Sequence, residues 1–196
     1  MHTPPSRKDI SHERIVAVAA RAIRRGGFQG VGVADIMKEA GLTHGGFYAH
    51  FRNRDALLVE ALERAGQDTA AQLRDGVARR QARGHSPLRA LVEAYLSERH
   101  LGEIETGCAV AALVSEMPRQ AAEVREAAAQ RVRGLLAGLR RALPENAPAA
   151  SAAAVASQMV GALQLARALG DNAEGRALLK AAREALLSQH DRQARD

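Results

Sequence analysis

Residues 43–54, with the sequence THGGFYAHFRNR, combine two adjacent glycines with hydroxyl, imidazole and guanidinium groups. Large apolar side chains follow the glycines at helical spacing, because Phe47 and Phe51 are one helical turn apart. A glycine inside a helix costs about 0.5–1 kcal/mol relative to alanine, so Gly45 and Gly46 weaken any helix formed here. The pattern indicates either that something outside the protein approaches this backbone closely, or that Gly45 eases a tight turn.

Positive charge is concentrated in the same part of the chain. Residues 1–54 hold nine Lys and Arg against four Asp and Glu, whereas all 196 residues carry a formal net charge of +6. Such segregation is typical of an electrostatic footprint for phosphate groups. An ordinary solvated basic face would have the same composition.

Helices must position these groups, and the apolar periodicity predicts an all-α protein with no strand-like alternation and no internal repeat. The expected helices cover about residues 11–25, 33–40 and 44–51, then 54 into the seventies or beyond, 87–101, 109–117, 118–143, 149–169 and 173–189. The chain is long enough to bury a core, which alanine and leucine must build because aromatic residues make up only 3%.

Capping residues mark the predicted helix boundaries. Ser11, Thr43 and Asn53 are expected N-caps, since their side-chain oxygens accept from free backbone N–H groups. Gly26–Gly27 and Gly41 are expected to end the first and second helices. The short turn before Thr43, between two short helices, predicts a helix-turn-helix.

The stretch DIMKEAGLTHGGFYAHFRNRDALL resembles the helix-turn-helix of the TetR family of bacterial transcriptional regulators. The residues at the pattern positions are Thr43, Gly45, Tyr48, His50, Phe51, Asn53 and Asp55, with Arg54 where Lys is usual. The resemblance covers about a third of the chain. It implies a three-helix DNA-binding domain, residues 1–54, followed by a larger helical ligand-binding and dimerisation domain, residues 55–196.

The resemblance also implies that residues 43–50 enter the major groove of a palindromic operator in double-stranded DNA. The expected DNA-binding residues are Thr43, His44, Gly45, Gly46, Tyr48, Ala49, His50 and Arg54. Tyr48 and His50 are expected on phosphates, with Arg54 as an added cation. Ala49 is expected near a thymine methyl, and His44 is equally a base contact or a plain surface residue. Phe47 and Phe51 are expected in the core.

For the second domain, the resemblance implies a homodimer through the last two helices and a small-molecule effector. Small residues around Gly161 support close helix approach, although they would equally suit an internal core. The expected lining of a small aliphatic effector cavity is Tyr95, Cys108, Leu113, Met117, Met159 and Leu163. Each of these residues is equally compatible with ordinary core packing.

The sequence therefore predicts a ligand-responsive transcriptional regulator, a repressor that an effector releases from its operator, with activation left open. One alternative is a sequence-tolerant protein that coats DNA. Another is a regulator in which Cys108, at a predicted helix N-terminus, senses electrophiles or oxidants. The alternative interpretation of Cys108 is a small buried hydrophobe.

Other functional classes are disfavoured by the residues present. No nucleophile with partners, metal-ligand spacing or phosphate-binding glycine loop is recognised, so no catalysis, cofactor or metal is expected. The single cysteine and the polar opening predict a cytoplasmic protein without a membrane partner. The apolar stretch 147–166 is expected as a buried helix rather than a membrane span.

Overall fold

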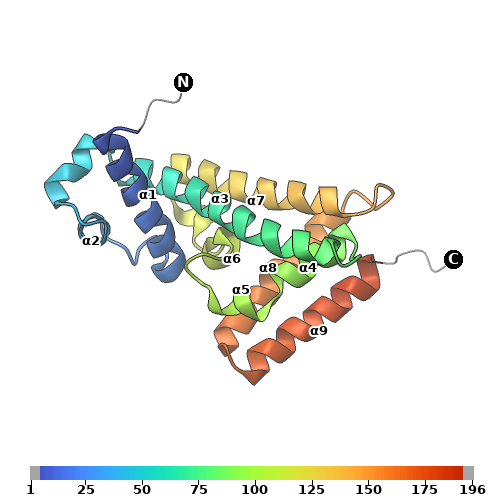
Figure 1. Ribbon diagram of the computed structural model, residues 1–196. Coiled ribbons are helices and arrows are strands. Elements are labelled where there is room, and N and C mark those ends of the chain that lie inside the picture. Colours follow the sequence, from blue (N-terminus) through green and yellow to red (C-terminus); the bar gives the residue numbers. More distant parts are fainter. Residues whose placement is uncertain (1–4, 192–196) are drawn as a thin grey trace. The chain divides into compact units, whose positions relative to one another are not determined.

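A computed structural model describes residues 5–191, and within this range every regular element is a helix (Figure 1). The elements in chain order are α1 Arg7–Gly26, α2 Val33–Glu39, the 3₁₀ helix η1 His44–Ala49, α3 Arg54–Gln81, α4 Pro87–Tyr95, α5 Glu98–Gly102, α6 Ala109–Leu113, the 3₁₀ helix η2 Met117–Arg119, α7 Ala122–Ala142, α8 Ser151–Leu169 and α9 Ala173–His190. The all-α prediction is confirmed.

The chain forms two compact units that interleave along the sequence. Unit 1 contains the residues up to Asp68 together with Glu105–Arg131, and unit 2 contains Thr69–Ile104 together with the residues from Val132 onward. Helices α3 and α7 each contribute one part to each unit. The functional boundary expected between residues 54 and 55 lies in the first turn of α3 and stays a prediction.

Helix α1 begins at Arg7, so the predicted start at Ser11 is wrong. Ser6 is the N-cap, and it forms a capping box in which Ser6 Oγ accepts from Asp9 N at 3.2 Å and Asp9 Oδ2 accepts from Ser6 N at 2.9 Å. The Ser11 hydroxyl instead donates to the carbonyl of Arg7 at 2.9 Å, one turn inside the helix.

Two glycines end the first two helices, as predicted. Gly27 has φ 75° and Gly41 has φ 71°, a left-handed backbone that strains residues with a side chain. Gly27 also leaves space for Glu116, whose Oε1 would lie 2.4 Å from a Cβ at this position. The Glu116 carboxylate accepts the backbone N–H of Phe28 at 2.9 Å, which ties the α1–α2 turn to the segment after α6.

The core of unit 1 is built around fully buried aromatic and branched side chains. Its members include Ile15, Ile23, Phe28, Ile36, Met37, Phe47, Phe51, Leu57, Leu62, Leu113, Met117 and Val124. Residues from α6, η2 and α7 therefore complete a core that the first helices begin. Burying a side chain of this size stabilises the fold by about 1.5–3 kcal/mol.

Arg24 is a buried cation in this core, with its side chain 0% exposed. It donates to Asp68 Oδ2 at 3.1 Å and to the carbonyls of Ala65 and Gly107, each at 3.3 Å. Burial lowers the pKa of Arg24, and the hydrogen bond that Arg24 donates to Asp68 opposes that shift. The three acceptors join α1 to α3 and to the residue before Cys108.

Several later helices are shorter than predicted. The expected helix 87–101 is broken at Leu96 (φ −90°, ψ 43°), because Ser97 caps α5 by accepting from His100 N at 3.2 Å. The expected helices at 109–117 and 118–143 become α6, η2 and α7, and Pro118 lies in η2.

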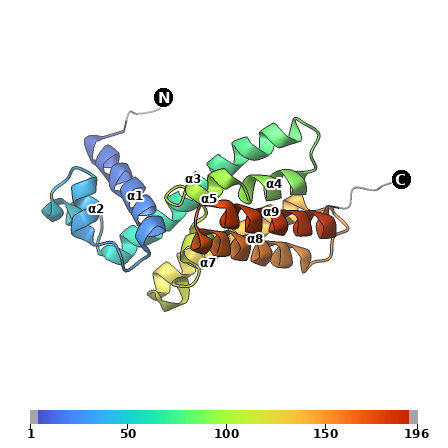
Figure 2. The same cartoon turned by 90° about the horizontal axis from the view of Figure 1, so that it is seen from below.

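In unit 2, α8 and α9 run alongside each other in both views (Figures 1 and 2). Asn172 caps α9 by accepting from the N–H groups of Glu174 at 2.9 Å and Gly175 at 3.1 Å. Among the described helices, α8 is long and apolar enough to cross a membrane, with mean hydropathy 1.2. Core helices of globular proteins share these properties, and Val155, Met159 and Leu163 are buried along α8.

The burial of His100 makes stability depend on pH. Burial lowers its pKa from 6.5 to about 4, so between these values the unfolded chain binds a proton that the folded protein does not. The contribution of His100 to the free energy of unfolding is therefore present above pH 6.5 and is lost as the pH falls toward 4. We expect His100 to account for about 2 kcal/mol of lost unfolding free energy between pH 7 and pH 5.

Denaturant unfolding of the H100Q variant at both pH values measures this contribution. H100Q should show a smaller difference between pH 7 and pH 5 than the unchanged protein, while the exposed-site variant H44Q should behave like the unchanged protein. An unaltered pH difference in H100Q would contradict the assignment.

Candidate nucleic-acid interface

The turn between α2 and η1 is closed by backbone hydrogen bonds and by one apolar side chain that packs on the core. Leu42 N donates to Met37 O at 2.9 Å, and the half-buried Leu42 packs on the core. Thr43 follows in extended conformation (φ −78°, ψ 147°) at the N-cap position of η1. Its predicted position is confirmed, but its side chain makes no capping hydrogen bond.

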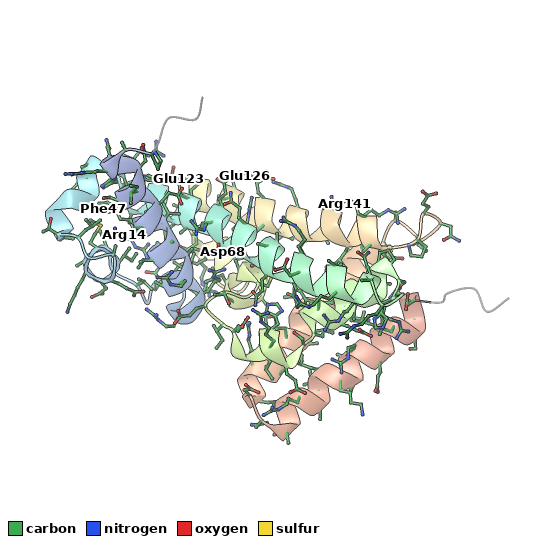
Figure 3. The ribbon with its side chains drawn as sticks, viewed as in Figure 1. Arg14, Phe47, Asp68, Glu123, Glu126 and Arg141 are labelled. Atoms are coloured by element: carbon green, nitrogen blue, oxygen red, sulfur yellow. The ribbon has the colours of Figure 1, made fainter. Side chains whose placement is uncertain are left out.

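The predicted third helix is present as a 3₁₀ helix that ends at Ala49 rather than an α-helix that reaches residue 51. Two rings hold it, because Phe47 and Phe51 are 2% and 3% exposed and stack with centroids 5.5 Å apart. Figure 3 labels Phe47 in this part of unit 1. With these rings buried, the opposite side faces solvent, and Tyr48 is 73% exposed.

Neither glycine in η1 is required by the fold. A Cβ built at the exposed Gly45 meets nothing within 4 Å, and one at Gly46 meets only Met37 Cε and Thr43 Oγ1, both at the ordinary distance of 3.7 Å. Both glycines have negative φ, which any residue adopts. Packing and backbone conformation within the described chain therefore do not explain this pair.

Beyond the glycines, a histidine cluster supports the end of η1. His12 of α1 stacks on Phe51 with centroids 4.6 Å apart, lies 5.8 Å from the ring of His50, and its Nε2 is 2.6 Å from Glu60 Oε2 of α3. The cluster thus joins α1, the residue after η1, and α3.

Burial lowers the pKa of His50, and His12 and Lys8 lower it further, which favours the neutral ring. Its Nδ1 is buried and has no hydrogen-bond partner within residues 5–191. Nε2 is then the ring nitrogen available to a partner outside the fold.

Sequence reasoning missed the proximity of Lys8 and His12 to His50. The two residues are one helical turn apart and share a face of α1, but the late predicted start of this helix hid that relation. Arg7 and Lys8 lie in the first turn of α1.

Most cations of the first 54 residues have partners inside the protein. Arg54 donates to the carbonyl of Phe28 and lies 3.5 Å from that of Val31, so it braces the α1–α2 loop. The other paired side chains are Arg14, Arg21, Arg24, Arg25 and Arg52.

Within the described range, the side chains of Arg7, Lys8 and Lys38 form no hydrogen bond or ion pair. The expected role of Arg54 as a DNA-binding cation stays a prediction.

The six expected effector-binding residues do not share one core. Tyr95, Met159 and Leu163 lie in unit 2, and the others, Cys108, Leu113 and Met117, lie in unit 1. All six are buried, and a pocket in unit 2 is lined by different residues. Their common role as an effector lining stays a prediction.

Cys108 is 5% exposed and sits at the N-cap of α6, a helix of only 5 residues. The burial agrees with the small-hydrophobe interpretation, and the sensing role stays a prediction. Among residues 5–191, no group of three or more His, Cys, Asp and Glu could hold a metal ion.

Comparison with known proteins supports the interpretation of the first helices. Residues 15–61 match the family model described as bacterial regulatory proteins, tetR family. The chain is 30% identical over 105 residues to the HTH-type transcriptional regulator MT0206 of Mycobacterium tuberculosis, which is 53% of this chain and 52% of the relative. It is 37% identical over 51 residues to the HTH-type transcriptional regulator YerO of Bacillus subtilis, which is 26% of this chain and 18% of that protein. The chain thus spans about half the length, or less, of these curated relatives.

Solved structures share the fold over nearly the whole chain. Reduced NemR of Escherichia coli superposes with a TM-score of 0.74 at 21% identity, covering 91% of this chain and 96% of NemR. A TetR-family transcriptional regulator from Cytophaga hutchinsonii superposes with a TM-score of 0.76 at 16% identity, covering 98% and 100%. Residues 15–61, which contain the helix-turn-helix at 33–49, therefore match the tetR family of bacterial regulatory proteins, and the solved structures show that the whole chain shares their fold.

Proposed function

We propose that this protein is a cytoplasmic transcriptional repressor that binds operator DNA through residues 43–50. The observation that carries the proposal is the pair Gly45–Gly46, which the fold does not require and of which Gly45 is exposed and Gly46 half-buried. A helix without side chains at two adjacent positions lets its backbone come close to base edges and phosphates in the major groove.

Side chains around the glycines supply the proposed contacts. Tyr48 presents its hydroxyl from a ring that is 73% exposed, and His50 offers an imidazole N–H donor; both suit phosphate oxygens. Thr43 and His44 are exposed at the leading end of η1, where base edges would be read. Ala49 is exposed and small enough to accept a thymine methyl.

The proposed homodimer uses the outer faces of α8 and α9. On α8, Ser157 and Leu165 are exposed, and a Cβ at Gly161 between them would meet nothing within 4 Å. On α9, Ala177 and Ala181 are exposed one turn apart. Small residues on both helices permit the close approach of a second copy, and a two-fold pair would match a palindromic operator.

Contacts within unit 1 provide a means for an effector to act on the DNA-binding helices. Arg24 donates to Gly107 O, Phe28 N donates to Glu116, and Arg52 pairs with Glu123 of α7, which Figure 3 labels. A small molecule that prefers a different arrangement of the 105–123 segment would shift these contacts. The ligand would then lower the affinity for DNA. The size of this effect is limited by the difference between the ligand's affinities for the two arrangements.

A competition shift assay with the DNA that flanks this gene tests the proposal. The labelled flanking duplex should stay bound in excess unlabelled scrambled duplex and be displaced by unlabelled flanking duplex. Equal displacement by both would favour the sequence-tolerant DNA-coating alternative, and no shift would remove DNA binding altogether.

Replacing Gly45 with a residue that has a side chain separates DNA contact from folding. Because the site is open, G45A should keep or raise the unfolding free energy, by up to about 1 kcal/mol, while weakening flanking-DNA affinity at least about tenfold. G134A in α7, where a Cβ also meets nothing within 4 Å, is the matched control and should retain full affinity. Melting temperatures and shift assays measure both properties; parallel loss of stability and affinity in G45A would support the turn-easing role instead.

A charge placed on the outer face of α8 tests the dimer. Leu165 is 60% exposed, so L165R should fold normally but bring two like charges together near the two-fold axis. We expect sedimentation analysis to show the dimer dissociation constant raised at least about tenfold. I104R changes another exposed side chain, 42% accessible, and should remain dimeric. A dimer of L165R with unchanged affinity would exclude this face.

A further inference from the structure

Unit 2 contains a pocket of about 100 Å³ between the last turns of α3, the end of α4, and α5. Its polar wall is formed by Gln72, Arg79, Arg80, Ser97, Arg99 and His100. Leu73 and Ala94 supply apolar surface, and none of the lining residues is acidic. A pocket with guanidinium donors and no carboxylate favours an anionic ligand.

The charges around the pocket leave an excess of one positive charge. Arg80 Nε lies 3.4 Å from Glu93 Oε2, and Arg99 Nε lies 2.9 Å from Glu103 Oε1, so these two cations are neutralised by carboxylates outside the lining. Arg79 is exposed and forms no ion pair within the described part of the chain.

His100 adds no charge to the wall. Burial lowers its pKa to about 4, and its Nδ1 lies 2.7 Å from the carbonyl of Tyr95. The Ser97 hydroxyl is also engaged, because it donates to the carbonyl of Ala94 at 2.9 Å. Gln72 Nε2 donates to Glu103. The cationic donors left for a ligand are therefore the Arg79 guanidinium and the two terminal nitrogens of Arg99, whose Nε alone is used within residues 5–191.

We propose that this pocket binds a small organic acid with a single carboxylate and a short apolar chain. The carboxylate would accept from Arg79 and Arg99, and the chain would lie against Leu73 and Ala94. A single negative charge matches the excess positive charge, whereas a phosphate dianion would be left half compensated. The inference rests on the proposed function only in identifying this acid as the effector.

The same contacts suggest how binding would reach the DNA-binding helices. A ligand carboxylate on the terminal nitrogens of Arg99 would share that guanidinium with Glu103, which is held through Nε. The chain continues from Glu103 to Glu105 and Gly107, which accept from Arg25 and Arg24 of α1. A shift of Arg99 on binding would therefore move Glu103 and perturb a segment that holds the last turn of α1.

Calorimetric titration of the full-length protein with sodium butyrate tests the proposal without DNA. Butyrate should bind saturably, with a dissociation constant on the order of 1 mM, and neutral butyramide and inorganic phosphate should bind much more weakly. R79Q should weaken butyrate at least about tenfold, and R99Q should weaken it as well. R74Q, an exposed arginine of α3 outside the pocket, is the matched control and should bind like the unchanged protein.

Absence of saturable butyrate binding would overturn the proposal. So would equal binding of butyramide or phosphate, or unchanged affinity in R79Q. This outcome is distinguishable from failure of the proposed function. A protein that does not bind its flanking DNA could still bind butyrate in a way that depends on Arg79.

Discussion

The stacked pair Phe47 and Phe51 is the interaction on which the DNA-binding surface depends. A 3₁₀ helix of 6 residues that contains two glycines has no independent stability. It persists because one face is fixed in the core of unit 1, where the rings meet Met37 and Leu58 in a common cluster. Fixing that face determines which side remains accessible, and that side holds Gly45 and Tyr48.

The histidine cluster strengthens the same anchor. His12 covers Phe51 and pairs with Glu60, so α1 and α3 both hold the residue that follows η1. Partners inside the protein also occupy most of the basic side chains of this region. The net charge of residues 1–54 therefore overstates the cations available to DNA, which places more weight on backbone, hydroxyl and neutral imidazole donors.

The sequence predicted the elements that local chemistry controls. The glycines after α1 and α2 end helices as expected, and Asn53 caps α3 by accepting from Ala56 N at 2.8 Å. The aromatic residues of the first helices lie in the core because a small domain needs large rings to bury enough surface. The start of α1 was missed because Ser6 and Ser11 are equally plausible caps, and only the carboxylate of Asp9 distinguishes them.

Features that depend on distant residues were not predictable in this way. The break at Leu96 follows from Ser97 competing as a cap inside an apolar periodic stretch. The pocket of unit 2 is lined by arginines, which in the sequence have the pattern of a solvated helix face. Its position depends on the packing of α3 beside α5, which the sequence does not specify. Buried apolar residues such as Met159 and Leu113 carry no sequence signal that separates a ligand lining from ordinary core.

Hydrogen exchange of the full-length protein on DNA tests the central claim most directly. Deuterium uptake by the backbone amides of residues 43–50 would be compared with flanking duplex, with scrambled duplex of equal length, and without DNA. Flanking duplex should lower uptake across 43–50 far more than scrambled duplex does. Equal uptake in all three samples, or protection confined to other segments, would contradict it.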